Sequence, residues 1–390
     1  MMNLSENFLE SYNVSTEFGF LMIKPLEYLP EYFKSWNSLA KDMPDLVKKK
    51  QLREAVHEMD LLDFKKLDGH RQYRLAHLQL SIIASGYIWQ EGDSGAAKVL
   101  PKNVSIPWCG VSEYLDLQPV LSHASLVLAN WGYTGEGSSV RSLYRIPGGS
   151  DAEWFITVTT KTELAFAAGL QNLMQVLYHA EHGNIQELTK CLTEATQTVH
   201  NMKKVVSTMH ENLSAETFYD VMRPFLTGWG GDGSPLPDGI IYEGVSDKPR
   251  KMTGGSAAQS STLQCIDAVL GVKHSQGNRD FLMNMRNYMP PSHREFLYTI
   301  ERQSKVKSTV ESSNCDKLTE AYNQCVKAVV NFRSYHIQIV TKYIVLMANR
   351  ESRNKDYESL ATMGTGGSSI LPFLKSLRTT TSACLKDTET

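Results

Sequence analysis

A long stretch near the C-terminus, from Asp316 to Arg350, carries apolar residues at every third or fourth position. This spacing follows one face of an α-helix and predicts a long helix with a buried stripe. The stripe contains Cys325, Val329, Phe332, His336, Ile339 or Val340, and Tyr343. Because such a stripe must be covered by other secondary structure, it is the strongest constraint on how the chain folds.

Helical periodicity also dominates the rest of the chain. It recurs in Glu54–Met59, Tyr73–Ser85, Thr162–His179 and Ile185–His210, whereas clear strand alternation is scarce. One segment is ambiguous, because Trp154–Thr160 (WFITVTT) is rich in the β-branched and aromatic residues that favour strands. It fits either a short strand or the buried start of the next helix. The sequence therefore predicts an all-α fold.

Glycine-rich segments suggest how the chain is divided. The segment 132–150 is long, polar and rich in helix breakers, so we expect it to link a small N-terminal helical domain (1–131) to a large helical domain (151–390). Three further glycine-rich segments, 228–239, 253–261 and 364–367, lie inside the expected large domain. Long loops within a compact domain are often functional.

Charge and cysteine content exclude several classes of protein. The chain of 390 residues has 40 basic and 42 acidic side chains and a net charge of -2, which does not favour nucleic-acid binding. None of the six cysteines forms a C-x-x-C pair, so a structural zinc site is not expected. No signal peptide or membrane-spanning segment is recognisable. We therefore expect a soluble protein of the reducing cytoplasm, with no membrane partner.

Common catalytic motifs are absent from the sequence. It contains no G-x-S-x-G, no G-x-x-x-x-G-K-[ST] and no H-E-x-x-H. The glycine-rich run Thr253–Ser261 could bind an anion through backbone N–H groups, but a plain connector is the more common explanation of such a run.

His336 lies within the apolar stripe of the long helix, so its imidazole needs a polar partner. That partner can be a carbonyl, a carboxylate or a metal. His77 has a similar apolar setting, and periodicity does not distinguish the two. A single histidine cannot build a zinc site, but it can be the axial ligand of a haem, whose porphyrin supplies four nitrogens.

Arg223 is the second candidate for a functional residue. It follows Phe218 and Tyr219 at helical spacing and precedes Pro224. An arginine beside aromatic rings suits a ligand with a carboxylate and a flat ring. A structural ion pair, or packing on Trp229, is the alternative.

Several segments closely resemble the indoleamine 2,3-dioxygenase family. The segment FRSYHIQIVTKYI (Phe332–Ile344) resembles the helix that carries the proximal haem ligand in that family. Other similar segments, in family order, are GHRQYRLAHLQL, GYIWQEG, LVLANW, IPGG, LPDGIIYEG, GGSAAQSS, YMPPSHREF and GTGG. The resemblance extends from about Leu9 to Arg378, which is nearly the whole chain.

The resemblance implies a two-domain, all-helical haem protein that cleaves the indole 2,3-bond of L-tryptophan with O2, giving N-formylkynurenine. One haem b per chain would be bound with His336 as the proximal ligand. Arg333 and Asp267 would form an ion pair on the haem side of the pocket, and Gly255, Ser256 and Ala257 would belong to a loop over the distal haem face.

The resemblance also implies which residues bind the substrate. Arg223 would bind the substrate carboxylate, and Phe218 and Phe155 would pack on the indole. Tyr219 stands where the family often has a second Phe, Thr159 where many members have Ser, and His123 where some members have Tyr. Thr365 would belong to a loop that closes on the substrate. No residue corresponds to a general base, so no catalytic side chain is expected.

Family resemblance leaves more than one function open. Some molluscan relatives are oxygen-storing myoglobins, so an oxygen carrier is the main alternative, and a haem-dependent signalling protein is a third. Retention of both Phe218 and Arg223 favours an enzyme acting on tryptophan or another indoleamine. Such an enzyme needs O2 and an electron donor for ferric haem, and we expect it to be a monomer.

Overall fold

The computed structural model describes residues 6–135, 139–231, 233–350 and 370–386. Throughout this part of the chain helices dominate, and the strands form two short two-stranded sheets, so the predicted all-α fold is confirmed. The longer helices are α2 (Lys34–Lys48), α4 (Gly69–Trp89), α5 (Lys102–Leu115), α6 (Gly149–His182), α7 (Ile185–Ser207), α9 (Ser261–Leu270), α10 (Gln276–Arg286), α11 (Pro291–Gln303), α13 (Asp316–Val340) and α15 (Ile370–Ser382). Shorter ones are α1 (Glu6–Ser11), α3 (Leu52–Glu58), α8 (Met209–Asn212), α12 (Val306–Ser312) and α14 (Leu346–Ala348).

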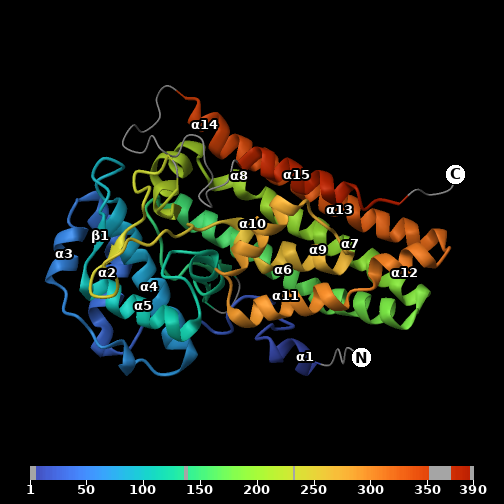
Figure 1. Ribbon diagram of the computed structural model, residues 1–390, viewed down its shortest axis with the longest axis horizontal. Coiled ribbons are helices and arrows are strands. Elements are labelled where there is room, and N and C mark those ends of the chain that lie inside the picture. Colours follow the sequence, from blue (N-terminus) through green and yellow to red (C-terminus); the bar gives the residue numbers. More distant parts are fainter. Residues whose placement is uncertain (1–5, 136–138, 232, 351–369, 387–390) are drawn as a thin grey trace.

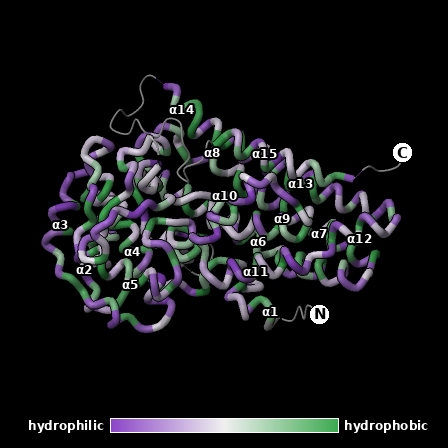
Figure 2. The backbone as a smooth tube through the Cα atoms, in the orientation of Figure 1, coloured by the Kyte–Doolittle hydropathy of each residue, from purple (hydrophilic) through white to green (hydrophobic). Residues whose placement is uncertain are grey.

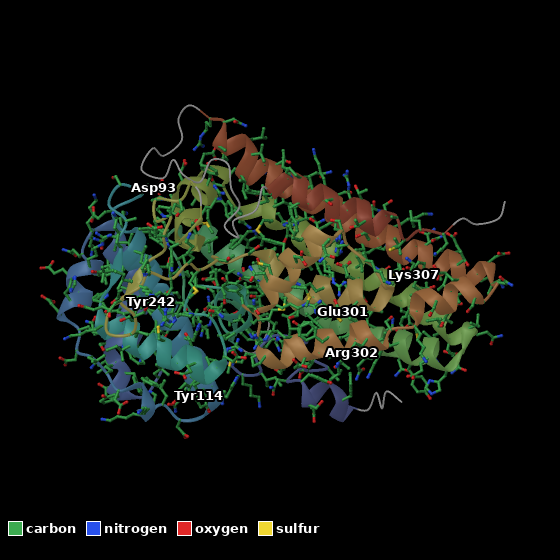
Figure 3. All side chains as sticks on the ribbon, viewed as in Figure 1. Asp93, Tyr114, Tyr242, Glu301, Arg302 and Lys307 are labelled. Atoms are coloured by element: carbon green, nitrogen blue, oxygen red, sulfur yellow. The ribbon has the colours of Figure 1, made fainter. Side chains whose placement is uncertain are left out.

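The four strands of the described residues contain two or three residues each. The strands β1 (Val99–Leu100) and β4 (Ile241–Tyr242) pair in parallel, and β2 (Gly132–Thr134) and β3 (Ser139–Arg141) form an antiparallel hairpin. The hydroxyl of Tyr242, labelled in Figure 3, donates to the carbonyl of Pro119 at 2.8 Å and so ties β4 to the chain that follows α5.

The helices form two groups, which lie at opposite ends of the molecule in Figure 1. At one end α2, α3 and α5 surround α4, which is buried on nearly every side from Tyr73 to Trp89. At the other end α6, α7, α13 and α15 run along the long axis, with α13 packed against both α7 and α15. The C-terminal half of the chain is therefore a bundle of long helices, as its periodicity predicts.

The ambiguous segment WFITVTT is helical and forms the second and third turns of α6. Gly148 precedes α6 with φ of 129°, a value that favours glycine, and Gly183 ends the helix in the left-handed conformation. Within α6 the side chains of Ile156 and Val158 are fully buried. Tertiary burial on several faces thus overrides the strand propensity of the β-branched residues.

The N-terminal segment packs on helices from the C-terminal half. Tyr12 contacts Phe296 of α11, with ring centroids 5.6 Å apart, and Phe20 stacks on Phe166 of α6 at 5.7 Å. The segment 132–150 contains the β2–β3 hairpin and the start of α6. The division into domains 1–131 and 151–390 stays a prediction.

Figure 2 shows apolar and polar residues interspersed along the helices. Within the described ranges, no helix combines the length and apolar character needed to cross a membrane.

Gly169 of α6 lies directly against Thr198 of α7. A β-carbon built on Gly169 would lie 2.0 Å from the Oγ1 atom of Thr198 on α7, so a side chain here requires the helices to separate. Gly277, on α10, has nothing within 4 Å of the corresponding position.

We expect Gly169→Val to lower the free energy of unfolding by about 2 kcal/mol, because overpacking forces the two helices apart. Gly277→Ala is the control, and its better helix propensity should leave stability unchanged or raise it by up to about 1 kcal/mol. Urea unfolding followed by circular dichroism measures both. Equal midpoints for wild type and Gly169→Val would show that α6 and α7 do not need this contact.

Candidate functional site

His336 lies on α13 at the wall of three adjoining cavities, with volumes of about 190, 190 and 50 Å³. Within the described ranges its ring has no hydrogen-bond partner. Burial, with a smaller contribution from the positive charge of Arg333, lowers the pKa of His336 from 6.5 to about 4. The imidazole is therefore neutral at pH 7 and can act as a lone-pair donor.

His77, the competing histidine, is a core residue with satisfied hydrogen bonds. Its Nδ1 lies 2.7 Å from the hydroxyl of Ser125, and its Nε2 lies 3.1 Å from the carbonyl oxygen of Gln118. The side chain is fully buried on α4, and burial lowers its pKa to about 3. The structure thus separates the two histidines that periodicity leaves equivalent.

The two larger cavities share part of their walls, and we refer to the two together as the combined cavity. The shared lining residues are Phe155, Met209, Leu226, Gly255, Ser256, Ala257, His336 and Ile339. Arg223 and Phe218 line one of these cavities, whereas His123 and Thr159 line the other. The arginine and His123 therefore line different parts of the combined cavity.

The arginine end is built from two irregular helical segments. Phe218 and Tyr219 belong to a π-helical segment, η4 (Thr217–Met222), and Arg223 begins a 3-10 segment, η5 (Arg223–Leu226), at the predicted proline break. The rings of Phe218 and Phe155 pack with centroids 5.3 Å apart. Arg223 is fully buried, and burial lowers its pKa to about 10, which leaves it charged at pH 7.

Tyr219, expected to contact the substrate, is not among the residues that line the described cavities. Its ring centroid instead lies 5.1 Å from the guanidinium carbon of Arg223. The π-helical geometry directs Phe218 to the cavity and Tyr219 to the arginine. Tyr219 thus packs against the guanidinium group of Arg223.

The other end of the combined cavity contains a buried acid–base pair. The Nε2 atom of His123 lies 3.0 Å from Oε1 of Glu163, a residue of α6. Thr159, one turn before Glu163, donates its hydroxyl to the carbonyl of Phe155 at 2.8 Å. Glu163 was not among the residues predicted from the sequence, although its position four residues after Thr159 places it on the same helix face.

The glycine-rich segment 253–261 forms a defined loop along the cavity. Ser256 caps the short 3-10 helix η6 (Ala257–Gln259) through a capping box with Gln259. The Gln259 side chain also donates to the carbonyl of Gly254 at 2.8 Å and accepts from the backbone N–H of His123 at 3.0 Å. These bonds hold the predicted residues Gly255, Ser256 and Ala257 at the cavity wall.

Arg333 and Asp267 form the expected ion pair beside the smallest cavity. The Nη2 atom of Arg333 donates to Oδ2 of Asp267 at 2.6 Å, and its Nη1 donates to the carbonyl of Leu377 at 3.1 Å. His274, which sequence reasoning missed, bonds the same carboxylate oxygen at 3.0 Å. Although burial opposes ionisation, these cationic and hydrogen-bonding partners lower the pKa of Asp267 overall.

One predicted site residue, Thr365, lies outside the described residues. The predicted stripe of the long helix already contains Ile339 or Val340 and Tyr343, and all three of these residues line the cavity. Sequence reasoning missed the other apolar lining residues, namely Ile344 of the π-helical segment η7 (Thr341–Val345), Phe281, Phe373 and Leu374. Among the described residues, no group of three or more His, Cys, Asp or Glu side chains could hold a metal ion by itself.

The fold and site define an all-helical protein whose internal cavity carries one neutral histidine, a charged arginine and aromatic walls. Comparison with known sequences gives the family. The sequence profile described as Indoleamine 2,3-dioxygenase matches residues 8–384, and the chain belongs to this family.

Relatives in the family have different names. A protein named Myoglobin from Haliotis madaka is 46% identical, over 95% of this chain and 97% of its own length. Indoleamine 2,3-dioxygenase 2 from Homo sapiens is 40% identical, over 95% of this chain and 93% of its own. A 6-hydroxytryptophan 2,3-dioxygenase from Fusarium equiseti is 30% identical, over 95% and 96% respectively.

The core role of His77 can be tested through pH dependence. Its folded-state pKa of about 3 lies below its ordinary value of 6.5, so its neutral form stabilises the protein above pH 6.5, and this stability is lost as the pH falls. Since His77→Gln keeps hydrogen-bonding groups and removes the titration, wild type should lose about 2 kcal/mol relative to this variant between pH 7 and pH 5. Urea unfolding of both proteins at the two pH values gives the difference. A constant difference would contradict a neutral, buried His77.

Proposed function

We propose that the protein is a haem-dependent dioxygenase that cleaves the indole 2,3-bond of L-tryptophan, or of another indoleamine, with O2 to give N-formylkynurenine. One haem b per chain would be held by His336. The observation that carries this proposal is the cavity shared by a neutral histidine and a charged, fully buried arginine. Family membership supports the same reaction class.

The residues around His336 fit a haem. The imidazole is neutral and has no hydrogen-bond partner among the described residues, as an axial ligand requires. The apolar residues Phe332, Ile339 and Leu374 line the adjoining cavities and suit a flat macrocycle. Arg333 also has a buried Nε atom without a partner in the described ranges, which suits an anionic group nearby.

When bound, haem supplies the redox-active iron that activates O2 for addition across the indole double bond. An external electron donor keeps that iron ferrous. The ion pair of Arg333 and Asp267, one turn before His336, holds α13 in position and so orients the imidazole.

The chain's own task is to position the substrate and exclude water. Arg223 binds the substrate carboxylate through paired N–H donors, and Phe218 and Phe155 pack against the indole ring. The hydroxyl of Thr159 is engaged with the backbone of α6, so it does not act as a base. The reaction uses no protein general base, because the indole itself is the electron-rich partner of O2.

The second candidate function is oxygen binding without useful turnover. The observation that favours it is the presence, among the relatives, of two Haliotis proteins named Myoglobin, which are 46% and 45% identical to this chain. A carrier needs His336 and an apolar cavity, but it does not need a buried arginine that binds carboxylate.

One experiment separates the two functions. The haem-loaded protein is reduced, exposed to air with and without L-tryptophan, and followed by its visible spectrum and by an assay for N-formylkynurenine. Repeated turnover with product supports the dioxygenase. A stable oxygenated spectrum that tryptophan does not discharge, without product, supports the carrier.

We expect Arg223→Ala to lower kcat/KM for tryptophan about 100-fold or more and to leave haem content unchanged, because a charge-assisted, paired contact to the carboxylate is lost. Arg302→Ala, which removes an exposed arginine of α11, is the control and should behave as wild type. Steady-state kinetics and the haem-to-protein absorbance ratio measure both effects. Loss of haem in Arg223→Ala would assign the residue to the cofactor instead.

We expect His336→Ala to lose haem during gel filtration, because the substitution removes the proposed axial ligand. Added imidazole should partly restore haem binding by filling the space left by the side chain. Absorbance spectra with and without imidazole provide the measurement, and His77→Gln serves as the control. A histidine-type haem spectrum in His336→Ala without imidazole would rule out His336 as the ligand.

A further inference from the structure

The His123–Glu163 pair is an unusual feature for an otherwise apolar cavity. Both side chains are more than nine-tenths buried, and both line the cavity that His336 also lines. Glu163 accepts hydrogen bonds from the hydroxyls of Ser260 at 2.7 Å and Thr262 at 2.5 Å, in addition to its contact with His123. Three hydrogen-bond donors compensate the cost of burying the Glu163 carboxylate, so this group is a defined part of the cavity wall.

These donors determine which atom of His123 remains available. Although burial opposes ionisation, the bonds from His123, Thr262 and Ser260 lower the pKa of Glu163 overall and keep it ionised. An ionised carboxylate only accepts hydrogen bonds, so Nε2 of His123 must carry the proton that it donates. When the ring carries this one proton, Nδ1 has a free lone pair and can accept a hydrogen bond. Within the described ranges Nδ1 has no hydrogen-bond partner.

The neighbouring hydroxyls on α6 do not offer the same chemistry. Thr159 donates to the carbonyl of Phe155 at 2.8 Å, and Thr162 donates to the carbonyl of Val158 at 2.9 Å. Their protons are therefore used within the helix. Their hydroxyl oxygens can still accept a hydrogen bond, but an unprotonated imidazole nitrogen such as Nδ1 of His123 is the stronger acceptor.

The position of the pair relative to Arg223 defines the shape of the ligand that would use it. Arg223 lines one part of the combined cavity and His123 the other, while Phe155 and Leu226 line both. A ligand that fills this space has an anionic group at one end, a flat apolar middle, and its far edge near His123. For an indole amino acid bound by its carboxylate, that far edge is the benzene ring, at carbons 5 and 6.

We infer that His123, held by Glu163, is a specificity-determining residue that accepts a hydrogen bond from a hydroxyl group on the benzene ring of the substrate. The inference rests on the proposed function for the placement of the carboxylate at Arg223. It identifies ring-hydroxylated tryptophans as preferred over tryptophan itself. Tryptophan would leave the buried Nδ1 atom without a partner, which carries a cost that the hydroxylated ligand avoids.

The test compares binding and turnover of L-tryptophan, 5-hydroxy-L-tryptophan and 6-hydroxy-L-tryptophan. Dissociation constants come from optical titration of the ferric, haem-loaded protein, and kcat/KM comes from turnover under reducing conditions. At least one hydroxylated ligand should bind about tenfold more tightly than tryptophan, as expected for one hydrogen bond to a buried acceptor.

Two variants remove the acceptor in different ways. His123→Phe and His123→Leu both leave no polar atom, and the second, with a smaller side chain, tests the inference if the first fails to fold. In both, the ratio of the dissociation constants should fall to about one, while affinity for tryptophan is kept or improved. Thr162→Val, in the same cavity wall, is the matched control and should preserve the wild-type ratio.

Glu163→Gln tests the positioning role of the carboxylate. Because the amide is a weaker hydrogen-bond partner for Nε2 of His123, the preference for the hydroxylated ligand should decrease without disappearing. A merely structural role of Glu163 would instead change the affinities for tryptophan and for the hydroxylated ligand equally. Equal affinities in wild type, or an unchanged ratio in folded His123 variants, would overturn the inference. Binding preference without product from any ligand would contradict the proposed dioxygenase and leave this inference standing.

Discussion

The packing of α13 between α7 and α15 fixes the position of every group that can act on a ligand. His336 lies on this helix at the wall of the cavities, and Arg333, one turn earlier, is tied to α15 through the carbonyl of Leu377. Because a helix packed on both sides is rigid, the His336 imidazole does not have to move in order to bind a ligand. The facing wall is formed by α6, whose Phe155 and Thr159 project from one face toward the same space.

Buried charges connect these helices through α9. Near its N-terminus, the hydroxyls of Ser260 and Thr262 bind Glu163 of α6, and the carboxylate also lies near the favourable end of the helix dipole. Near its C-terminus, Asp267 binds Arg333 of α13. A slip of α9 along its axis would take hydrogen-bond donors away from two buried carboxylates, at a cost on the order of several kcal/mol in total. The two polar clusters therefore fix the register of the helices on both sides of the cavity, and function and fold share the same contacts.

Sequence periodicity predicts the helical fold well, and the reasons for its failures are physical. The helix that contains His336 is predicted correctly, because an amphipathic helix buried on one face shows the 3.6-residue period in its sequence. The segment WFITVTT is ambiguous because burial on several faces removes the period that distinguishes helix from strand. His336 and His77 are equivalent by pattern, and only their partners, which come from segments distant in sequence, separate them. Tyr219 packs on Arg223 and is not among the lining residues of the cavities described above, so its contact with the substrate stays a prediction. Glu163 was not predicted from the sequence because its hydrogen-bond partners, His123, Ser260 and Thr262, lie far from it along the chain.

The distribution of polarity in the cavity bears on the choice between an enzyme and an oxygen carrier. Dioxygen is small and uncharged, so binding it requires an axial ligand and an apolar space. This cavity instead has a fully buried arginine at one end and an ionised carboxylate behind a histidine at the other. Burying such groups opposes folding unless they gain partners, and a more apolar wall would make a more stable carrier. Their arrangement at opposite ends of a flat, aromatic-lined space corresponds to an elongated ligand with a carboxylate. The electrostatics of the cavity thus favour a second ligand beside O2, which is what a dioxygenase requires and a carrier does not.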